Sequence, residues 1–94
     1  MALVDEIIND VIADSKIWDL PLIYRIEIIE LAKKLKVPPR REAVKNFVAA
    51  YLVVRGLMSP STADRVVASS TKGRLLWQDR LRRVLSSTNV GAQL

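Results

Sequence analysis

The sequence contains no cysteine and no histidine, and these two absences exclude several classes of protein. Without cysteine there is no disulfide framework and no thiolate metal site. Without histidine the chain lacks the commonest general base and the commonest metal ligand. We therefore expect no metal and no cofactor. A chain without disulfides fits an intracellular setting, in the cytoplasm or nucleoid, or a virion assembled there.

Long apolar runs are also missing, although half of the residues are hydrophobic. No stretch reaches the roughly 18 apolar residues that a membrane-spanning helix needs, so no membrane partner is expected. The first six residues lack the basic start of a secretory signal. Asparagine and glutamine total five, and their scarcity beside abundant isoleucine, valine and arginine is typical of proteins from hot environments.

Charge is sorted along the chain. Residues 1–31 hold seven acids and two bases, a net charge of −5, whereas residues 32–94 hold thirteen bases and three acids, a net charge of +10; the two add up to +5. A basic region of this strength indicates an acidic partner, most often nucleic acid.

The apolar spacing predicts helices throughout, over residues 3–16, 20–36 with Pro21 in the first turn, 39–55, a short segment from Pro60, and 74–86. Asp19 is the expected N-cap of the second helix, Pro39 the first residue of the third and Gly56 the residue that ends it. Ser59 is the expected cap of the fourth. The fold class is all-α, a compact bundle of four to five short helices. Residues 1–87 form one helical domain and 88–94 a flexible C-terminal tail.

Six bases lie within residues 33–45, a segment that we call the basic elbow because Val37-Pro38-Pro39 bends it: Lys33, Lys34, Lys36, Arg40, Arg41 and Lys45. Cations held on a rigid bend can meet successive phosphates of a nucleic acid and release condensed counterions. The plainer interpretation gives the lysines to the dipole of the preceding helix and pairs the arginines with acids of the first helix.

The last predicted helix and its approach carry a second group of candidate nucleic-acid contacts: Lys72, Arg74, Gln78, Arg80, Arg82 and Arg83. The fourth helix, a polar turn at 69–73 and this helix resemble a helix-turn-helix pair in which Gln78 and Arg82 reach base edges. Phosphate contact without sequence preference is the more economical reading, and an arginine-rich solvent face is the plainer one.

The aromatic residues could stack on nucleobases, but Phe47, Tyr51 and Trp77 fall on apolar helix faces and are expected in the core. Trp18, at a break between helices, is expected to cover the core. The carboxylate pairs Asp10/Asp14 and Glu27/Glu30 have no accompanying catalytic motif, so they are read as solvated and no enzyme is expected.

The second and third helices carry more apolar surface than a 94-residue monomer easily hides. We therefore expect a homodimer or higher homo-oligomer, with a self-contained monomer as the alternative. The sequence favours a small nucleic-acid-binding protein that contacts duplex DNA mainly through phosphates. The alternative is a structural or adaptor subunit, such as a viral coat or nucleocapsid component, that acts through protein–protein contacts.

Overall fold

The structure, a computed structural model, describes residues 3–17 and 19–93, with side chains described as far as Ser86. Its elements are five helices: α1 (Val4–Asp14), α2 (Leu22–Lys34), α3 (Arg41–Val54), α4 (Pro60–Val66) and α5 (Thr71–Gln93). The described residues contain no strand. The predicted all-α bundle of four to five helices is therefore confirmed, whereas Trp18 lies outside the described residues.

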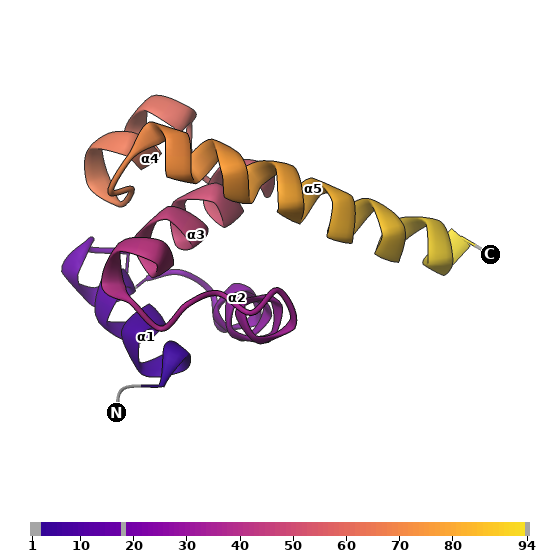
Figure 1. The fold of residues 1–94 in the computed structure, drawn as a ribbon, viewed down its shortest axis with the longest axis horizontal. Helices are drawn as coiled ribbons and strands as arrows, with labels where there is room; N and C mark the ends of the chain where they lie inside the picture. The colour runs from indigo at the N-terminus through magenta and orange to yellow at the C-terminus, as the bar shows by residue number, and fades with distance from the viewer. Residues whose placement is uncertain (1–2, 18, 94) are drawn as a thin grey trace.

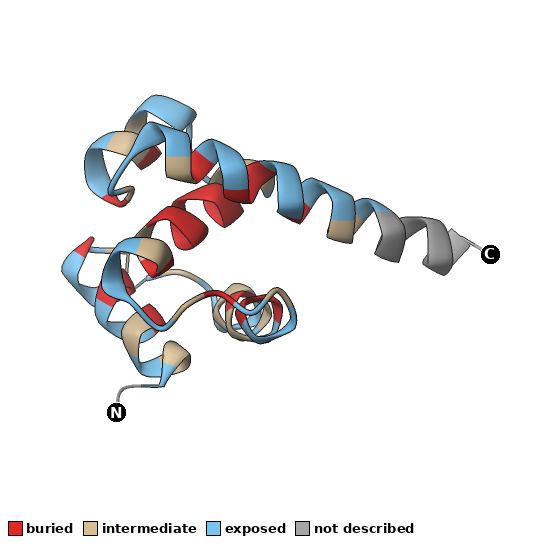
Figure 2. Cartoon of the chain, in the orientation of Figure 1, coloured by how far each residue is buried: buried red, intermediate tan, exposed pale blue. Residues whose placement is uncertain are grey.

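Helix α3 is the centre of the bundle. Every residue from Asn46 to Leu52 is buried, and α1 and α2 pack on one side of α3 while α4 and α5 pack on the other (Figures 1 and 2). The apolar character of α3 all round its circumference is thus used within one chain. Each fully buried side chain as large as Phe47 contributes about 2–3 kcal/mol, so α3 supplies much of the folding energy.

Three helices end in the same way, with a residue in the left-handed backbone region. Lys16, Lys36 and Gly56 have φ values of 60°, 56° and 72°. In each case the N–H of the next residue donates to the carbonyl five residues before it, at 3.1, 2.9 and 2.8 Å, which closes the last helical turn. The ending predicted at Gly56 is confirmed. The two lysines hold a conformation that glycine adopts more easily.

Two predicted helix starts are wrong. Helix α2 begins at Leu22 with Pro21 in the cap position, so Asp19 does not cap it. Helix α3 begins at Arg41, two residues after Pro39, because the N–H of Arg40 donates to the carbonyl of Pro38 at 2.7 Å and forms a tight turn first. The start of α4 is confirmed, since the Ser59 hydroxyl accepts from the N–H of Thr62 at 3.3 Å.

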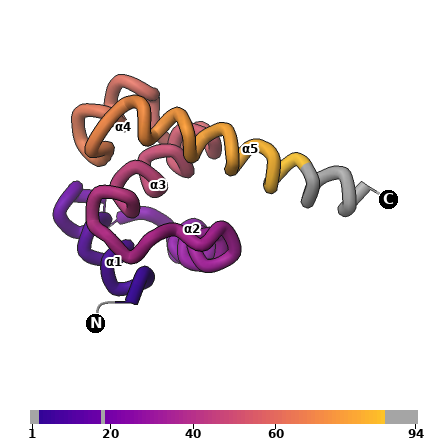
Figure 3. Tube along the Cα trace, viewed as in Figure 1, coloured from indigo at the N-terminus to yellow at the C-terminus, as the bar shows by residue number. Residues whose placement is uncertain are grey.

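Helix α5 is longer than predicted at both ends, since it begins at Thr71 and reaches Gln93 instead of covering 74–86. The hydroxyl of Ser70 accepts from the N–H of Gly73 at 3.0 Å and so caps a helix that includes residues predicted as a turn. No proline follows Ser86, and α5 extends beyond the other helices toward the C-terminus (Figures 1 and 3). The flexibility predicted for 88–94 stays a prediction.

None of the helices in the described part of the chain combines the length and the hydropathy that crossing a membrane requires.

Candidate nucleic-acid interface

The basic elbow joins α2 to α3. Lys33 and Lys34 lie in the last turn of α2, Lys36 follows in the left-handed position, and Arg40 precedes α3. All four side chains are exposed, and Lys45, in the second turn of α3, is half-buried. Within the described residues none of these five cations forms an ion pair. The elbow therefore presents concentrated positive charge to solvent.

Arg41 is the exception in the elbow, because its guanidinium pairs with the carboxylate of Asp14 at the end of α1. This contact confirms the plainer interpretation for this one arginine. A second contact of the same kind joins Arg55, at the end of α3, to Glu27 of α2 at 2.5 Å. Both pairs are substantially exposed, so each contributes little to stability.

On α5, Arg74 and Gln78 are buried, each with 4% of its surface exposed. The Nε of Arg74 donates to Asp64 of α4 at 2.6 Å, and a terminal nitrogen of Arg74 donates to the Gln78 side chain. Thr71 also donates to Asp64, at 2.9 Å. The hydrogen bond from Arg74 lowers the pKa of Asp64. This network ties α4 to α5 and keeps Arg74 and Gln78 out of reach of base edges.

The other cations of α5 are exposed. Arg80 lies over the ring of Trp77, with its guanidinium carbon 4.8 Å from the ring centroid. Arg83 pairs with Asp79 one turn earlier at 2.9 Å, and a pair this exposed is weak. Lys72 and Arg82 form no ion pair within the described residues.

Of the eleven cations among the candidates, three form ion pairs, which leaves eight without one in the described part of the chain. Among these candidates only Arg41 pairs, in the described part of the chain, with an acid from the first 31 residues; outside the candidates Arg55 pairs with Glu27. The acidic start of the sequence therefore cancels little of the later positive charge.

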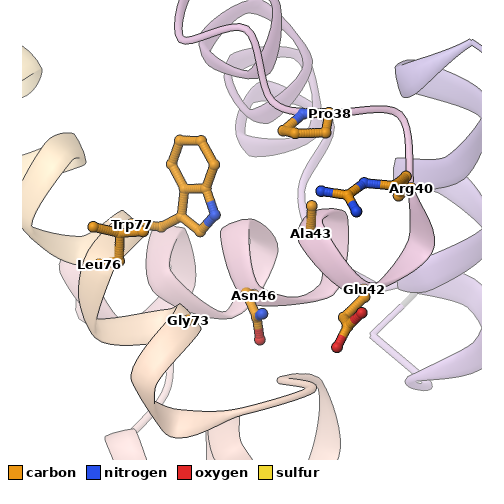
Figure 4. Close-up of a pocket in the computed structure, with 8 residues that line it drawn as sticks. All are labelled: Pro38, Arg40, Glu42, Ala43, Asn46, Gly73, Leu76 and Trp77. Atoms are coloured by element: carbon orange, nitrogen blue, oxygen red, sulfur yellow. The ribbon is translucent and has the colours of Figure 1, made fainter.

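An open hollow of about 280 Å³ lies between the elbow and α5 (Figure 4). Pro38 and Arg40 border it from the elbow, and Gly73, Leu76 and Trp77 border it from α5. The elbow and α5 thus border one depression, although Arg40 is the only one of the twelve candidate residues in its lining. Its lining is completed from α3 by Glu42, Ala43 and Asn46.

The connection between α4 and α5 comprises the four residues 67–70. This length falls in the range of helix-turn-helix turns, which join two helices through about three to four residues. The sequence suggested a longer turn because Thr71–Gly73 were assigned to it. Asn46 fixes the connection, since its side-chain oxygen accepts from the N–H groups of Ser69 and Ser70 at 2.9 and 3.0 Å.

The aromatic residues with a predicted core position are buried, as expected: Phe47, Tyr51 and Trp77. Phe47 meets Trp77 edge to face with ring centroids 5.5 Å apart. Tyr51 donates to Glu27, and burial together with this hydrogen bond raises the pKa of Tyr51 above its usual range. Glu27 was expected to be simply solvated. Although burial alone would raise its pKa, hydrogen bonds from Arg55 and Tyr51 lower it.

Carboxylates do not converge on a metal-binding arrangement: within the described residues, no three acidic side chains lie close enough to hold an ion. Asp14 accepts a hydrogen bond from Arg41, and Glu27 accepts hydrogen bonds from Tyr51 and Arg55. The other two carboxylates of the predicted pairs, Asp10 and Glu30, are exposed.

Two polar groups of the hollow were missed in the sequence, the amide of Asn46 and the indole N–H of Trp77. Asn46 is the one uncharged polar residue in the apolar stretch 44–54, and that position was a usable signal. Trp77 was assigned to the core because its ring is apolar, and its indole N–H was not considered. Comparison with family models, with curated proteins and with solved structures finds no match for this chain.

Proposed function

We propose that this protein binds duplex DNA, mainly through the phosphates, with the basic elbow as the principal contact. The observation that carries the proposal is the group of five elbow cations that no carboxylate of the described residues neutralises. Cations of this kind release counterions when they meet phosphates, and the gain does not depend on base sequence. Lys72, Arg80 and Arg82 extend the positive surface along α5.

The burial of Arg74 and Gln78 favours phosphate contact over base reading. An amide or a guanidinium must reach a base edge in the groove to discriminate between base pairs. The only glutamine with a described side chain is held by Arg74 inside the protein. The proposed interface therefore consists of exposed lysines and arginines, which position a protein on DNA without specifying a sequence.

The acidic surface of α1 fits the same proposal. Figure 1 shows α1 and α5 on opposite sides of α3, and the exposed carboxylates of Glu6 and Asp10 belong to α1. DNA that lies along α5 would be separated from these acids by α3, whereas the elbow runs beside α1, where Arg41 pairs with Asp14 (Figure 1). The acids of α1 would limit the adhesion of the free protein to other polyanions.

Fluorescence anisotropy with two labelled duplexes of unrelated sequence tests the proposal. The expected result is saturable binding of both duplexes at low salt, with affinities that agree within about threefold, because phosphates are common to all sequences. Absence of binding at low ionic strength would contradict the proposal. A strong preference for one duplex would contradict the phosphate-only contact.

The alternative, a structural or adaptor subunit, is supported by the start of α2. Leu22 and Ile23 are 70% and 73% exposed, and Ile26 follows on the same face. Grouped exposed apolar side chains mark protein interfaces. We propose that this face joins two copies of the chain. Light scattering should then give a mass that rises with concentration, and Ile23→Glu should yield a monomer; a concentration-independent monomer would remove this proposal.

A further inference from the structure

The hollow between the elbow and α5 contains hydrogen-bond donors that have no acceptor. The indole of Trp77 is 6% exposed and the amide of Asn46 is 7% exposed. Among the described residues neither the Trp77 Nε1–H nor the Asn46 Nδ2–H donates to any acceptor. No described side-chain nitrogen or oxygen is both sealed from solvent and unpartnered, so both donors have some access to solvent. Figure 4 shows the indole nitrogen of Trp77 facing the hollow, whereas the Asn46 amide points toward the same side as the Glu42 carboxylate, at the margin of the hollow.

Arg40 adds a charged donor at the rim. Figure 4 shows the Arg40 guanidinium directed toward the same space as the indole nitrogen of Trp77, while the Glu42 carboxylate points away from both. Arg40 forms no ion pair within the described part of the chain. An indole has only a donor and a guanidinium has only donors. The side-chain groups that face the hollow thus offer hydrogen atoms and positive charge, and they call for an acceptor.

The donors are held in place before any ligand arrives. The ring of Trp77 is held by two contacts. It meets the ring of Phe47 edge to face with the centroids 5.5 Å apart, and the guanidinium carbon of Arg80 lies 4.8 Å from the Trp77 centroid. Asn46 is fixed by the two N–H groups that its oxygen accepts. Fixed donors lose little conformational freedom when they bind, so they hold an anion better than flexible surface lysines do.

The hollow has room for one small ligand. Small-molecule sites usually measure about 300–1,000 Å³, and the hollow, at about 280 Å³, lies just below that range. A planar carboxylate offers two oxygens in one plane, whereas a phosphate presents oxygens in several directions to donors from separate elements. Arg40 of the elbow and Trp77 of α5 are the donors that face the hollow.

We propose that this hollow is a phosphate-binding site in which Arg40 and Trp77 donate to the oxygens of one phosphate group, with the Asn46 amide at the margin of the site. The inference rests on the proposed function for its natural ligand, a backbone phosphate of duplex DNA. A free phosphate ion has the same chemistry and would bind the same donors. The site would fix the position of one phosphate, and the exposed lysines would then hold its neighbours.

Nuclear magnetic resonance of the indole N–H of Trp77 reads the site directly. The other indole signal, from Trp18, is assigned with Trp18→Phe. In separate titrations inorganic phosphate and a short duplex should each shift the Trp77 signal saturably. A carboxylate probe, acetate, should shift it only at much higher concentration.

Three variants test the individual donors. Arg40→Ala and Asn46→Asp should each weaken the binding of inorganic phosphate about tenfold or more, since the first loses a hydrogen bond to a charged group and the second places a negative charge at the margin of the site. Asn46→Asp keeps an oxygen for Ser69 and Ser70 but replaces the amide donor with a negative charge. Trp77→Phe keeps an aromatic ring against Phe47 and removes the N–H. Arg65→Ala, which removes an exposed guanidinium on α4, is the matched control and should leave phosphate binding unchanged.

The outcomes separate this inference from the proposed function. If the duplex binds but neither ligand moves the Trp77 signal, the phosphate site is wrong while DNA binding stands. If inorganic phosphate binds and the duplex does not, the hollow is a site for free phosphate and DNA binding is wrong. Equal loss of phosphate affinity in Arg40→Ala and Arg65→Ala would show diffuse electrostatic attraction and overturn the site.

Discussion

The basic elbow and helix α5 carry equal numbers of candidate residues in the sequence, but the structure uses them differently. In the elbow five of six side chains are cations without an ion pair in the described part of the chain, and only Arg41 is paired. In α5 Arg74 and Gln78 are buried, Arg83 is paired with Asp79, and Arg80 lies on Trp77. A count of charges along a sequence therefore overstates the positive surface of α5, because part of its charge holds the bundle together.

The largest effect is expected from reversing the elbow charges. Replacing Lys33, Lys34 and Lys36 with glutamate should lower the affinity for duplex DNA about 100-fold or more at low salt, because three phosphate contacts become repulsions. Arg65→Glu is the control for a single charge reversal elsewhere on the surface. If the elbow variant binds DNA as tightly as Arg65→Glu does, the principal contact lies elsewhere.

Arg74 should matter for stability instead of binding. Arg74→Met removes the partner of Asp64 and Gln78 and should lower the melting temperature by about 5 °C or more, measured by circular dichroism. Arg82→Met, at an exposed position on the same helix, should leave it nearly unchanged. Similar melting temperatures for the two variants would mean that the buried network contributes nothing.

The hydrogen-bond network around Arg74 also makes the stability of the protein depend on pH. Because the folded protein lowers the pKa of Asp64, its contribution is present above the ordinary value of 3.8 and is lost as the pH falls through the lower folded value. In Arg74→Met this part of the acid sensitivity should disappear.

Reversal of the exposed α5 arginines is expected to have a smaller effect on binding than reversal of the elbow. Arg82→Glu with Arg83→Glu should weaken DNA binding about tenfold or less, since Arg83 is already shared with Asp79. An anisotropy titration beside the elbow variant gives the comparison directly. A loss as large as that of the elbow variant would make α5 an equal contact and support the helix-turn-helix arrangement.

The smallest effect comes from the two left-handed lysines, and it separates stability from binding. Lys16→Gly and Lys36→Gly should each raise stability by about 0.5–1 kcal/mol, because glycine adopts a positive φ without steric cost. Only Lys36→Gly should weaken DNA binding, since Lys16 lies at the end of the acidic helix α1. Equal affinities of the two variants would remove Lys36 from the interface.

The local features of the fold could be predicted from neighbouring residues. Ser59-Pro60 and Gly56 bounded helices as expected, because a cap or a left-handed turn depends on a few consecutive residues. The start of α5 was missed although its cap is local, because Ser70 and Gly73 were assigned to a polar turn. What the sequence could not show is that Asn46, more than twenty residues away, holds Ser69 and Ser70 in place. No local pattern contains that contact.

The candidate site was predicted in part. The spacing 74, 77, 78, 81 places Arg74 and Gln78 on the buried face of Trp77 and Leu81. The prediction of both residues as nucleic-acid contacts overlooked this pattern. The hollow could not be foreseen, since its lining comes from the elbow, α3 and α5 and forms only when these three elements pack.

The salt dependence of DNA binding tests the central claim most directly. For the wild-type protein the logarithm of the affinity should fall with the logarithm of the salt concentration at a slope near −4.5, as expected for about five neutralised phosphates. With Lys33, Lys34 and Lys36 replaced by glutamine the slope should lie near −2, because about 0.9 is lost for each contact. A flat dependence in the wild type, or the same slope in both proteins, would contradict the account.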